Sequence, residues 1–209
     1  MNKILIIVII GGRHMPRALT VQEKKLQRKR LLDKGKEIAL SIGIRKISID
    51  DITKAAGMAK GTFYKHFDSK EKFIYEVIME FYQQIFIKSE QLIKQETDLP
   101  SNMHTLLINV FHLPEIIFLI KNYREIIELN DTLSPYEIEL TNQVEIDIYD
   151  QLLKKAGADT TIVSPEVVHN YFHMLYMVKG SEIMIKEYVT KTFELIIDSL
   201  ATYILGGML

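Results

Sequence analysis

The sequence has no cysteine, no tryptophan and only five prolines among its 209 residues. Without cysteine the chain can form no disulfide, no thiolate nucleophile and no cysteine-ligated zinc site. This composition fits a reducing cytoplasm, which is the expected location. The strongest apolar run, residues 4–10, is much too short to span a bilayer, and no convincing signal-peptide cleavage site follows it. No membrane partner is therefore expected.

The first residues differ in character from the rest. His14 and Met15 precede Pro16 as they would at a cloning junction or in an upstream in-frame extension. We therefore interpret residues 1–14 as a non-native or disordered leader and Met15 as the natural start.

The motifs of the common enzyme classes are missing as well. The sequence has no glycine-rich phosphate loop and no nucleophile elbow, and its carboxylate pairs lie on helix faces that look exposed. The histidines His104, His112, His169 and His173 share no metal-site spacing with nearby carboxylates. We predict that the chain is not an enzyme and carries no cofactor and no metal site.

Charge is balanced overall but unevenly distributed. The net charge is −1, yet residues 17–72 hold 15 basic and 7 acidic side chains, whereas residues 73–209 hold 9 basic and 20 acidic ones. The basic third predicts a surface that binds a polyanion, and the acidic remainder would repel it. The alternative, that these runs are only solvated helix faces, would not explain the motif found in the same third.

Apolar residues recur at helical spacing, and no alternating pattern of useful length remains, so we predict an all-α fold. Residues 22–42 form the first helix, which Gly43 ends, and residues 70–94 form a long helix. Pro100 is interpreted as the end of a linker that precedes a short helix at 102–112.

The last third contains three further predicted helices. Residues 135–156 form a long helix, Ser164-Pro165 begins a helix that is apolar on nearly all sides and kinks at Gly180, and the last helix has a single apolar stripe. In the first of these, the stripe comprises Leu140, Val144, Ile148 and Leu152.

The most informative segment is residues 57–67. Gly57 provides a permissive turn, and Phe63 and Phe67 lie four residues apart, so both can anchor a helix to a core. Between and beside them stand five cationic or hydroxyl-bearing donors, namely Lys60, Thr62, Tyr64, Lys65 and His66. A short helix that is polar on one side and follows a glycine turn is typical of a recognition helix in the major groove.

The flanks support a helix-turn-helix. Ser48 and Asp51 form a capping-box-like start for a helix that stops at Gly57, and the second helix extends from near Ala59 to near Phe67. Asp68 or Ser69 then caps the long helix.

In these residues the chain resembles the TetR family of transcriptional regulators, without a gap from about residue 30 to about residue 77. The matching positions are Gly43, Ile52, Ala56, Gly57, Gly61, Thr62, Phe63, Tyr64, His66, Phe67, Ser69, Lys70 and Glu71. The resemblance implies a three-helix DNA-binding domain at 15–72 and a helical-bundle domain for ligand binding and dimerisation at 73–209.

Three positions depart from the family pattern. Ala59 replaces the usual serine, so the recognition helix lacks a side-chain cap, and Thr53 replaces an alanine where the two helices touch. Gly35 and Ala39 are smaller than usual, so we expect the first helix to pack loosely.

The resemblance and the chemistry together assign roles at the DNA. We expect phosphate contacts from Ser48, Thr62, Tyr64, His66 and Lys70, and base contacts from Lys60 and Lys65, while Gly61 lets the backbone approach closely. Tyr64 and His66 could instead be structural. We interpret Ile52, Met58, Phe63 and Phe67 as core residues.

The C-terminal domain is expected to hold a small apolar or aromatic effector. The candidate ligand-binding residues are Phe111, Phe118, Tyr123, Tyr149, Tyr171, His173 and Tyr176, although aromatic residues at helical spacing are more often core, and His173 fits a hydrogen-bonded core histidine.

The last two helices are expected to pair with a second copy, through Phe193, Ile196, Ile197, Leu200 and Ile204. The favoured function is a ligand-responsive repressor that binds a palindromic double-stranded DNA operator as a homodimer. The alternatives are a monomer whose terminal helices cover its own core, and a protein that acts through protein contacts without an effector.

Overall fold

The computed structural model describes residues 19–208, so the interpretation of residues 1–14 lies outside the described part. This part of the chain is helical and contains no strand, which confirms the all-α prediction. The elements are α1 (Val21–Ile42), α2 (Ile49–Ala56), α3 (Lys60–Phe63), α4 (Lys70–Gln95), α5 (Leu99–Phe111), α6 (Pro114–Lys121), α7 (Tyr123–Asn130), α8 (Pro135–Lys155), α9 (Pro165–Gly180) and α10 (Lys186–Leu205).

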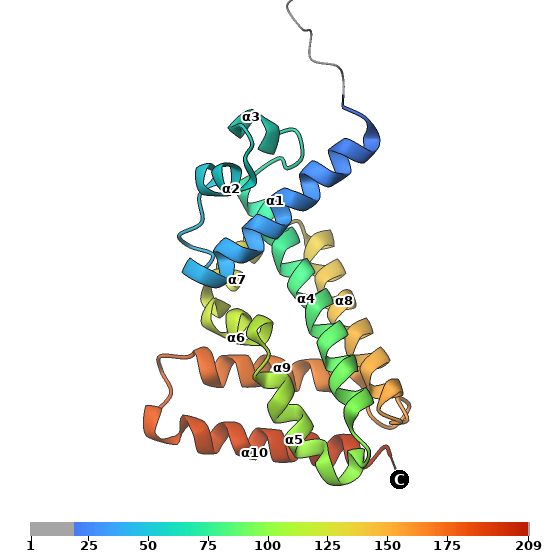
Figure 1. Ribbon diagram of the computed structural model, residues 1–209. Coiled ribbons are helices and arrows are strands. Elements are labelled where there is room, and N and C mark those ends of the chain that lie inside the picture. The colour runs from blue at the N-terminus through green and yellow to red at the C-terminus, as the bar shows by residue number, and fades with distance from the viewer. Residues whose placement is uncertain (1–18, 209) are drawn as a thin grey trace, which may run out of the picture.

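Two long helices organise the molecule. Figure 1 shows α1, α2 and α3 gathered around the start of α4, while α9 and α10 lie side by side at the opposite end. Helices α4 and α8 run together between the two ends, and α5, α6 and α7 fill the remaining side. One helix, α4, therefore belongs to both halves of the structure.

The predicted helix starts are largely confirmed because the caps are local. Ser48 and Ser69 accept hydrogen bonds from the backbone N–H groups of Asp51 and Lys72, and Gly43 ends α1 with a positive φ of 79°. Full capping boxes at the starts of α1 and α8, at Thr20 and Ser134, were not anticipated.

Three predicted boundaries were wrong. Helix α3 ends at Phe63 instead of near Phe67, because Ala59 gives it no side-chain cap and Gly61 is a poor helix former, and the chain continues as turns. Pro100 lies in the first turn of α5, where its missing N–H costs nothing, instead of ending a linker. Gly180 is the last residue of α9 and does not kink it.

The N-terminal core is built on three phenylalanines. Phe63, Phe67 and Phe73 are buried, with ring centroids 4.8–5.3 Å apart. Residues 60–67, called the recognition segment below, are therefore fixed to the first turn of α4. The loose packing expected at Gly35 was wrong: a Cβ there would lie 2.3 Å from the Phe73 ring. The absence of a side chain at Gly35 leaves the room that the Phe73 ring occupies.

Polar contacts join the N-terminal helices to the rest of the bundle. The buried Asn122, between α6 and α7, accepts a hydrogen bond from the Ile44 N–H at 3.0 Å and donates to the Phe118 carbonyl at 2.9 Å. Lys72 pairs with Glu137 at the start of α8, and this lysine, with Ser134, lowers the pKa of Glu137 to about 2. The Glu137 carboxyl group is therefore ionised at neutral pH.

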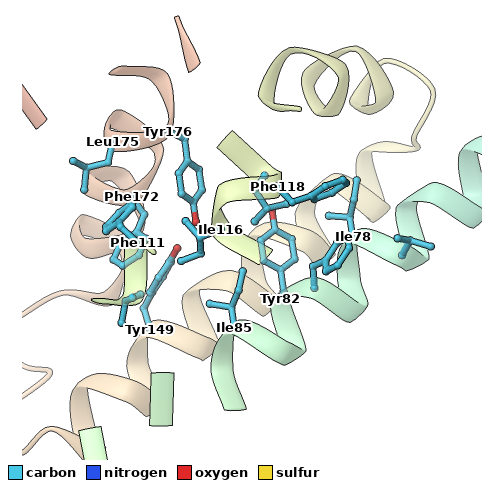
Figure 2. Close-up of a cluster of buried hydrophobic side chains, with 14 of the residues drawn as sticks. Ile78, Tyr82, Ile85, Phe111, Ile116, Phe118, Tyr149, Phe172, Leu175 and Tyr176 are labelled. Atoms are coloured by element: carbon cyan, nitrogen blue, oxygen red, sulfur yellow. The ribbon is translucent and has the colours of Figure 1, made fainter. Parts of the chain in front are cut away.

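The C-terminal core is aromatic (Figure 2). The Phe172 ring lies 4.8 Å from both Phe111 and Tyr149, and Phe81 packs on Phe118 at 4.6 Å. Within the described residues no single helix is long and apolar enough to cross a membrane; α5 and α6 reach that limit only as a pair, by length and composition, and are bent by 60° where they meet.

Replacing Gly35 with alanine tests the packing of α1 on α4. The new methyl group would collide with the Phe73 ring, which Phe63 and Phe67 hold in place, so we expect Gly35→Ala to destabilise the fold by about 1–3 kcal/mol despite the better helix propensity of alanine. Urea unfolding followed by circular dichroism measures this. An unchanged midpoint would show that the ring moves freely.

Candidate DNA-binding surface and C-terminal cavity

The turn between α2 and α3 has the geometry of a helix-turn-helix. Gly57 adopts the left-handed conformation, with φ 64° and ψ 39°, and the Met58 N–H donates to the Thr53 carbonyl at 2.8 Å. The Thr53 hydroxyl is buried and donates to the Ile49 carbonyl at 2.8 Å, so this departure from the family pattern is satisfied within α2. The turn directs α3 away from α2.

All eight predicted DNA-binding residues lie at least partly at the surface. Lys60, Gly61, Tyr64 and Lys65 are exposed, while Ser48, Thr62, His66 and Lys70 are half-buried; Phe63 and Phe67 are buried and Met58 packs against the core. Tyr64 is 52% exposed although its ring meets the edge of Phe63, which leaves its hydroxyl free to reach a ligand. The segment therefore has an anchored side and a polar side.

Two of these side chains already have local partners. The Lys60 ammonium lies 3.0 Å from the Asp50 carboxylate, which raises the pKa of Lys60, and both side chains are exposed. The Ser48 hydroxyl accepts from the Asp51 N–H and also donates to the Asp51 carboxylate. A phosphate at either position would have to compete with a carboxylate.

His66 marks a cluster of positive charge. Its Nε2 lies 3.3 Å from the Gln27 Oε1 of α1, and partial burial, followed by the charges of Arg28, Lys24 and Lys65, lowers its pKa. The imidazole is therefore neutral at pH 7 and can form hydrogen bonds within a cationic surface made by α1 and the segment after α3.

Gly61 is not required by the fold. It has no positive φ, and a Cβ built on it would meet nothing within 4 Å. A glycine inside a short helix costs stability, so its presence at an exposed position favours close approach of another molecule to the backbone.

The C-terminal half contains a cavity of about 200 Å³ beside α4. Its lining is aromatic and aliphatic with a polar end, and comprises Tyr75, Ile78, Tyr82, Tyr123, Ile126, Ile127, Leu129, Asn130, Leu133, Ile138, Thr141, Asn142, Glu145 and His173. A second, smaller cavity of about 60 Å³ is almost wholly apolar and lies between α5, α8 and α9.

The predicted ligand-binding residues do not form one group. Tyr123 and His173 line the larger cavity, and Tyr149 lines the smaller one. Phe111, Phe118 and Tyr176 are buried core residues, as the alternative interpretation held, and the Tyr171 hydroxyl lies 2.9 Å from Ser199 of α10.

The polar end of the larger cavity was missed by sequence reasoning. Glu145 of α8 is buried, and its carboxylate lies 3.3 Å from His173 Nε2 and 3.6 Å from His169 Nδ1. Burial raises the pKa values of Tyr82, Tyr149 and Tyr176, and the charge of Glu145 raises them further, so all three keep their protons. Burial lowers the pKa of His169.

The reason for the miss is a shift of the buried stripe on α8. The predicted stripe of Leu140, Val144, Ile148 and Leu152 is exposed at Leu140 and only half-buried elsewhere. The buried line is one residue further on, at Glu145, Tyr149 and Leu153. A glutamate in that line gave no hydrophobic signal to find it by.

Most of the residues predicted to form the dimer interface are buried inside the single chain instead. Phe193, Ile197, Leu200 and Ile204 are buried in the protomer's own core and Ile196 is half-buried. The apolar side chains that α9 and α10 do expose are Val167, Met174, Met177, Tyr188 and Leu195.

Comparison with known families identifies the N-terminal part of the chain. Residues 31–77, from the middle of α1 into α4, match the family model described as bacterial regulatory proteins, tetR family. The matched segment includes the turn at Gly57, α3 and the phenylalanine cluster.

Two curated relatives match in the same region. The HTH-type transcriptional repressor DhaR of Mycobacterium sp. (strain GP1) is 41% identical over 58 residues, which are 28% of this chain and 29% of DhaR. The HTH-type transcriptional repressor KstR2 of Rhodococcus jostii (strain RHA1) is 31% identical over 91 residues, 44% of this chain and 45% of KstR2. The matches therefore span less than half of each relative.

The whole fold has solved counterparts. A TetR-family transcriptional regulator from Pectobacterium atrosepticum superposes with a TM-score of 0.61 over 90% of this chain and 97% of its own, at 15% identity. At that identity the likeness concerns the fold alone, and it extends through the C-terminal helices.

The Gly61→Ala variant tests whether Gly61 is needed for contact with DNA or for folding. Because the added methyl group meets no protein atom, we expect the free energy of unfolding to stay the same or rise by up to about 1 kcal/mol. At a DNA groove the same methyl group would hold the backbone away, so affinity should fall about tenfold, or about 1.4 kcal/mol. Unfolding and DNA-binding titrations on one preparation measure both, and unchanged DNA affinity would contradict the close approach.

Proposed function

Since the chain belongs to the TetR family of bacterial regulatory proteins, we propose that it is a DNA-binding regulator and not an enzyme, namely a repressor that binds a palindromic operator as a homodimer and releases it when a small apolar effector binds. Its place of action would be the cytoplasm, where the chromosome is.

The observation that supports an effector is that α4 contacts both the recognition segment and the larger cavity. Its first turn holds Lys70, a predicted phosphate contact, and Phe73, which anchors the recognition segment. Two to nine residues after Phe73, the same helix contributes Tyr75, Ile78 and Tyr82 to the wall of the larger cavity. A ligand in that cavity would therefore touch the helix that positions α3.

The proposed switch is a shift between two arrangements of α4. A ligand favours one arrangement only if it binds it more tightly than the other. A ligand that fills the cavity would displace the middle of α4, and the phenylalanine cluster would transmit the displacement to α3. The spacing of two recognition segments would then no longer match one turn of DNA, about 34–36 Å.

The homodimer is supported by the exposed face of α9 and α10. Val167, Met174 and Met177 follow each other along α9, and Tyr188 and Leu195 along α10, with exposed fractions between 38% and 57%. Adjacent helices that expose apolar side chains in line are suited to an isologous pairing with a second copy.

Enrichment of genomic fragments on the protein, followed by salt titration, tests the DNA-binding role. We expect one palindromic site to be enriched, with affinity that falls steeply as salt rises. Lys70→Ala should lower the dependence of log affinity on log salt by about 0.9, as loss of one phosphate contact does. Lys65→Ala should cost about 1–3 kcal/mol and relax the preference at one base pair, as loss of a base contact does.

Lys154→Ala is the matched control, because Lys154 is an exposed lysine in the last turn of α8, at the other end of the molecule. It should change neither the salt dependence nor the base preference. Diffuse binding without an enriched site would overturn the operator proposal and favour action through protein contacts.

Leu195→Glu tests the proposed dimer face. Leu195 is 56% exposed, so the variant should fold as the wild type does. In a dimer, each copy would bury one glutamate carboxylate at the interface, which should weaken dimerisation at least about hundredfold, or about 3 kcal/mol. Sedimentation equilibrium measures the association. Leu140→Glu, at an exposed leucine of α8, serves as the control. Equal dimerisation of the Leu195 variant and the wild type would place the interface elsewhere.

A further inference from the structure

Three side chains with metal-binding atoms converge between α8 and α9. His169 and His173 lie four residues apart on α9, so they share one face of the helix, and Glu145 faces them from α8. A nitrogen or oxygen atom from each of the three lies within 4.8 Å of the other two. Two of the separations are shorter, 3.3 Å from Glu145 Oε2 to His173 Nε2 and 3.6 Å to His169 Nδ1.

These separations are those of ligands around one small ion. Nitrogen and oxygen ligands at 2.0–2.2 Å from a tetrahedral zinc ion lie about 3.3–3.6 Å from one another. An ion among the three atoms would need only small side-chain rotations, since the backbone of α8 and α9 already holds the groups together.

Among the described residues, no lysine or arginine pairs with Glu145. Glu115 and Glu145 are the two buried carboxylates among residues 19–208. Glu115 lies 2.5 Å from the ammonium of Lys88, whereas the ion-pair partners of Glu145 within the same residues are the two imidazoles. A buried carboxylate is costly without a positive partner.

One ring atom is also unpartnered. The Nδ1 of His169 is buried and has no hydrogen-bond partner in the described structure, although buried polar atoms nearly always have one. It points to the same place as the Glu145 carboxylate. A ligand at that place would satisfy both groups.

We propose that Glu145, His169 and His173 bind a divalent transition-metal ion, with zinc as the best match. Two imidazoles and one carboxylate suit zinc and its neighbours in the transition series, whereas magnesium and calcium prefer oxygen ligands throughout. Glu145 and His173 also border the larger cavity, so a water molecule can reach a fourth coordination position.

Cobalt(II) titration of the full-length protein, treated with EDTA and returned to metal-free buffer, tests the site. Cobalt in a four- or five-coordinate nitrogen and oxygen site gives visible absorption bands, and added zinc should remove them. We expect one cobalt ion per chain. Glu145→Gln and His173→Gln should each weaken binding at least about tenfold, the loss that removal of an outer-shell partner alone can cause.

The controls keep folding apart from binding. His173 is 35% exposed, so His173→Gln should fold normally even if the buried Glu145 variant does not, and circular dichroism checks both. His112→Gln, at an exposed histidine after α5, should bind cobalt as the wild type does. If no cobalt bands appear, or if the wild type and His173→Gln bind cobalt with equal affinity, the metal site is wrong and the three residues form only a hydrogen-bonded histidine–carboxylate cluster.

A regulatory role of the ion rests on the proposed function, and a separate measurement tests it. Because Tyr82 of α4 and Glu145 line the same cavity, an ion at Glu145 would lie beside the helix that positions α3. We expect zinc to change operator affinity at least about fivefold in the wild type and not in His173→Gln. If metal-free protein enriches no operator, the proposed function fails while the cobalt result stands. Zinc binding without a change in affinity would overturn the regulatory role.

Discussion

The packing of Phe73 against Gly35, Phe63 and Phe67 is the contact on which the N-terminal half depends. Helix α3 has four residues and no side-chain cap, so it has little stability of its own. Its position comes from two phenylalanines inserted beside the first turn of α4, and that turn comes close to α1 only because residue 35 has no side chain. The segment proposed to face DNA is therefore positioned by α4, so a movement of α4 would move it as well.

The C-terminal half is governed by a different constraint, the burial of polar groups in an aromatic core. Figure 2 shows Tyr82, Tyr149 and Tyr176 within the aromatic core. All three keep their protons because burial, and then the nearby charge of Glu145, oppose ionisation. Such a network is costly unless its members are satisfied. A core that only had to be stable would contain leucine at these positions, so the glutamate is better explained by a ligand or an ion.

The sequence predicted what is decided by neighbouring residues. Serine caps, the turn glycine and the spacing of Phe63 and Phe67 are local, and the structure confirms them. The sequence could not show which side of α8 faces the core. The predicted apolar stripe and the line that is buried, which includes Glu145, are offset by a single residue along the helix. Sequence reasoning also missed the cluster at Glu145, because the carboxylate and the two imidazoles come from different helices.

The apolar stripe of α10 shows the same limit in another form. A stripe that includes Phe193, Ile197 and Leu200 would serve an interface or a core equally well, and the structure uses it for the protomer's own core. The face proposed for a second copy is the less regular set of exposed side chains on α9 and α10, with Met174, Met177 and Leu195. Interfaces are less apolar than cores, so the strongest hydrophobic stripe in a chain is a poor guide to its interface.

The hydrogen bond between Asn122 and Ile44 offers a second connection between the cavity and the DNA-binding end. Tyr123 lines the cavity, and the residue before it holds the backbone N–H of Ile44, just after the glycine that ends α1. If a ligand displaced Tyr123, the buried Ile44 N–H would lose its acceptor at a cost of about 1–3 kcal/mol. Coupling free energies between allosteric sites have the same size. The hydrogen bond to Ile44 would therefore either resist a displacement at the cavity or transmit it to the loop before α2. An effector could then change the position of the recognition segment through this loop as well as through α4.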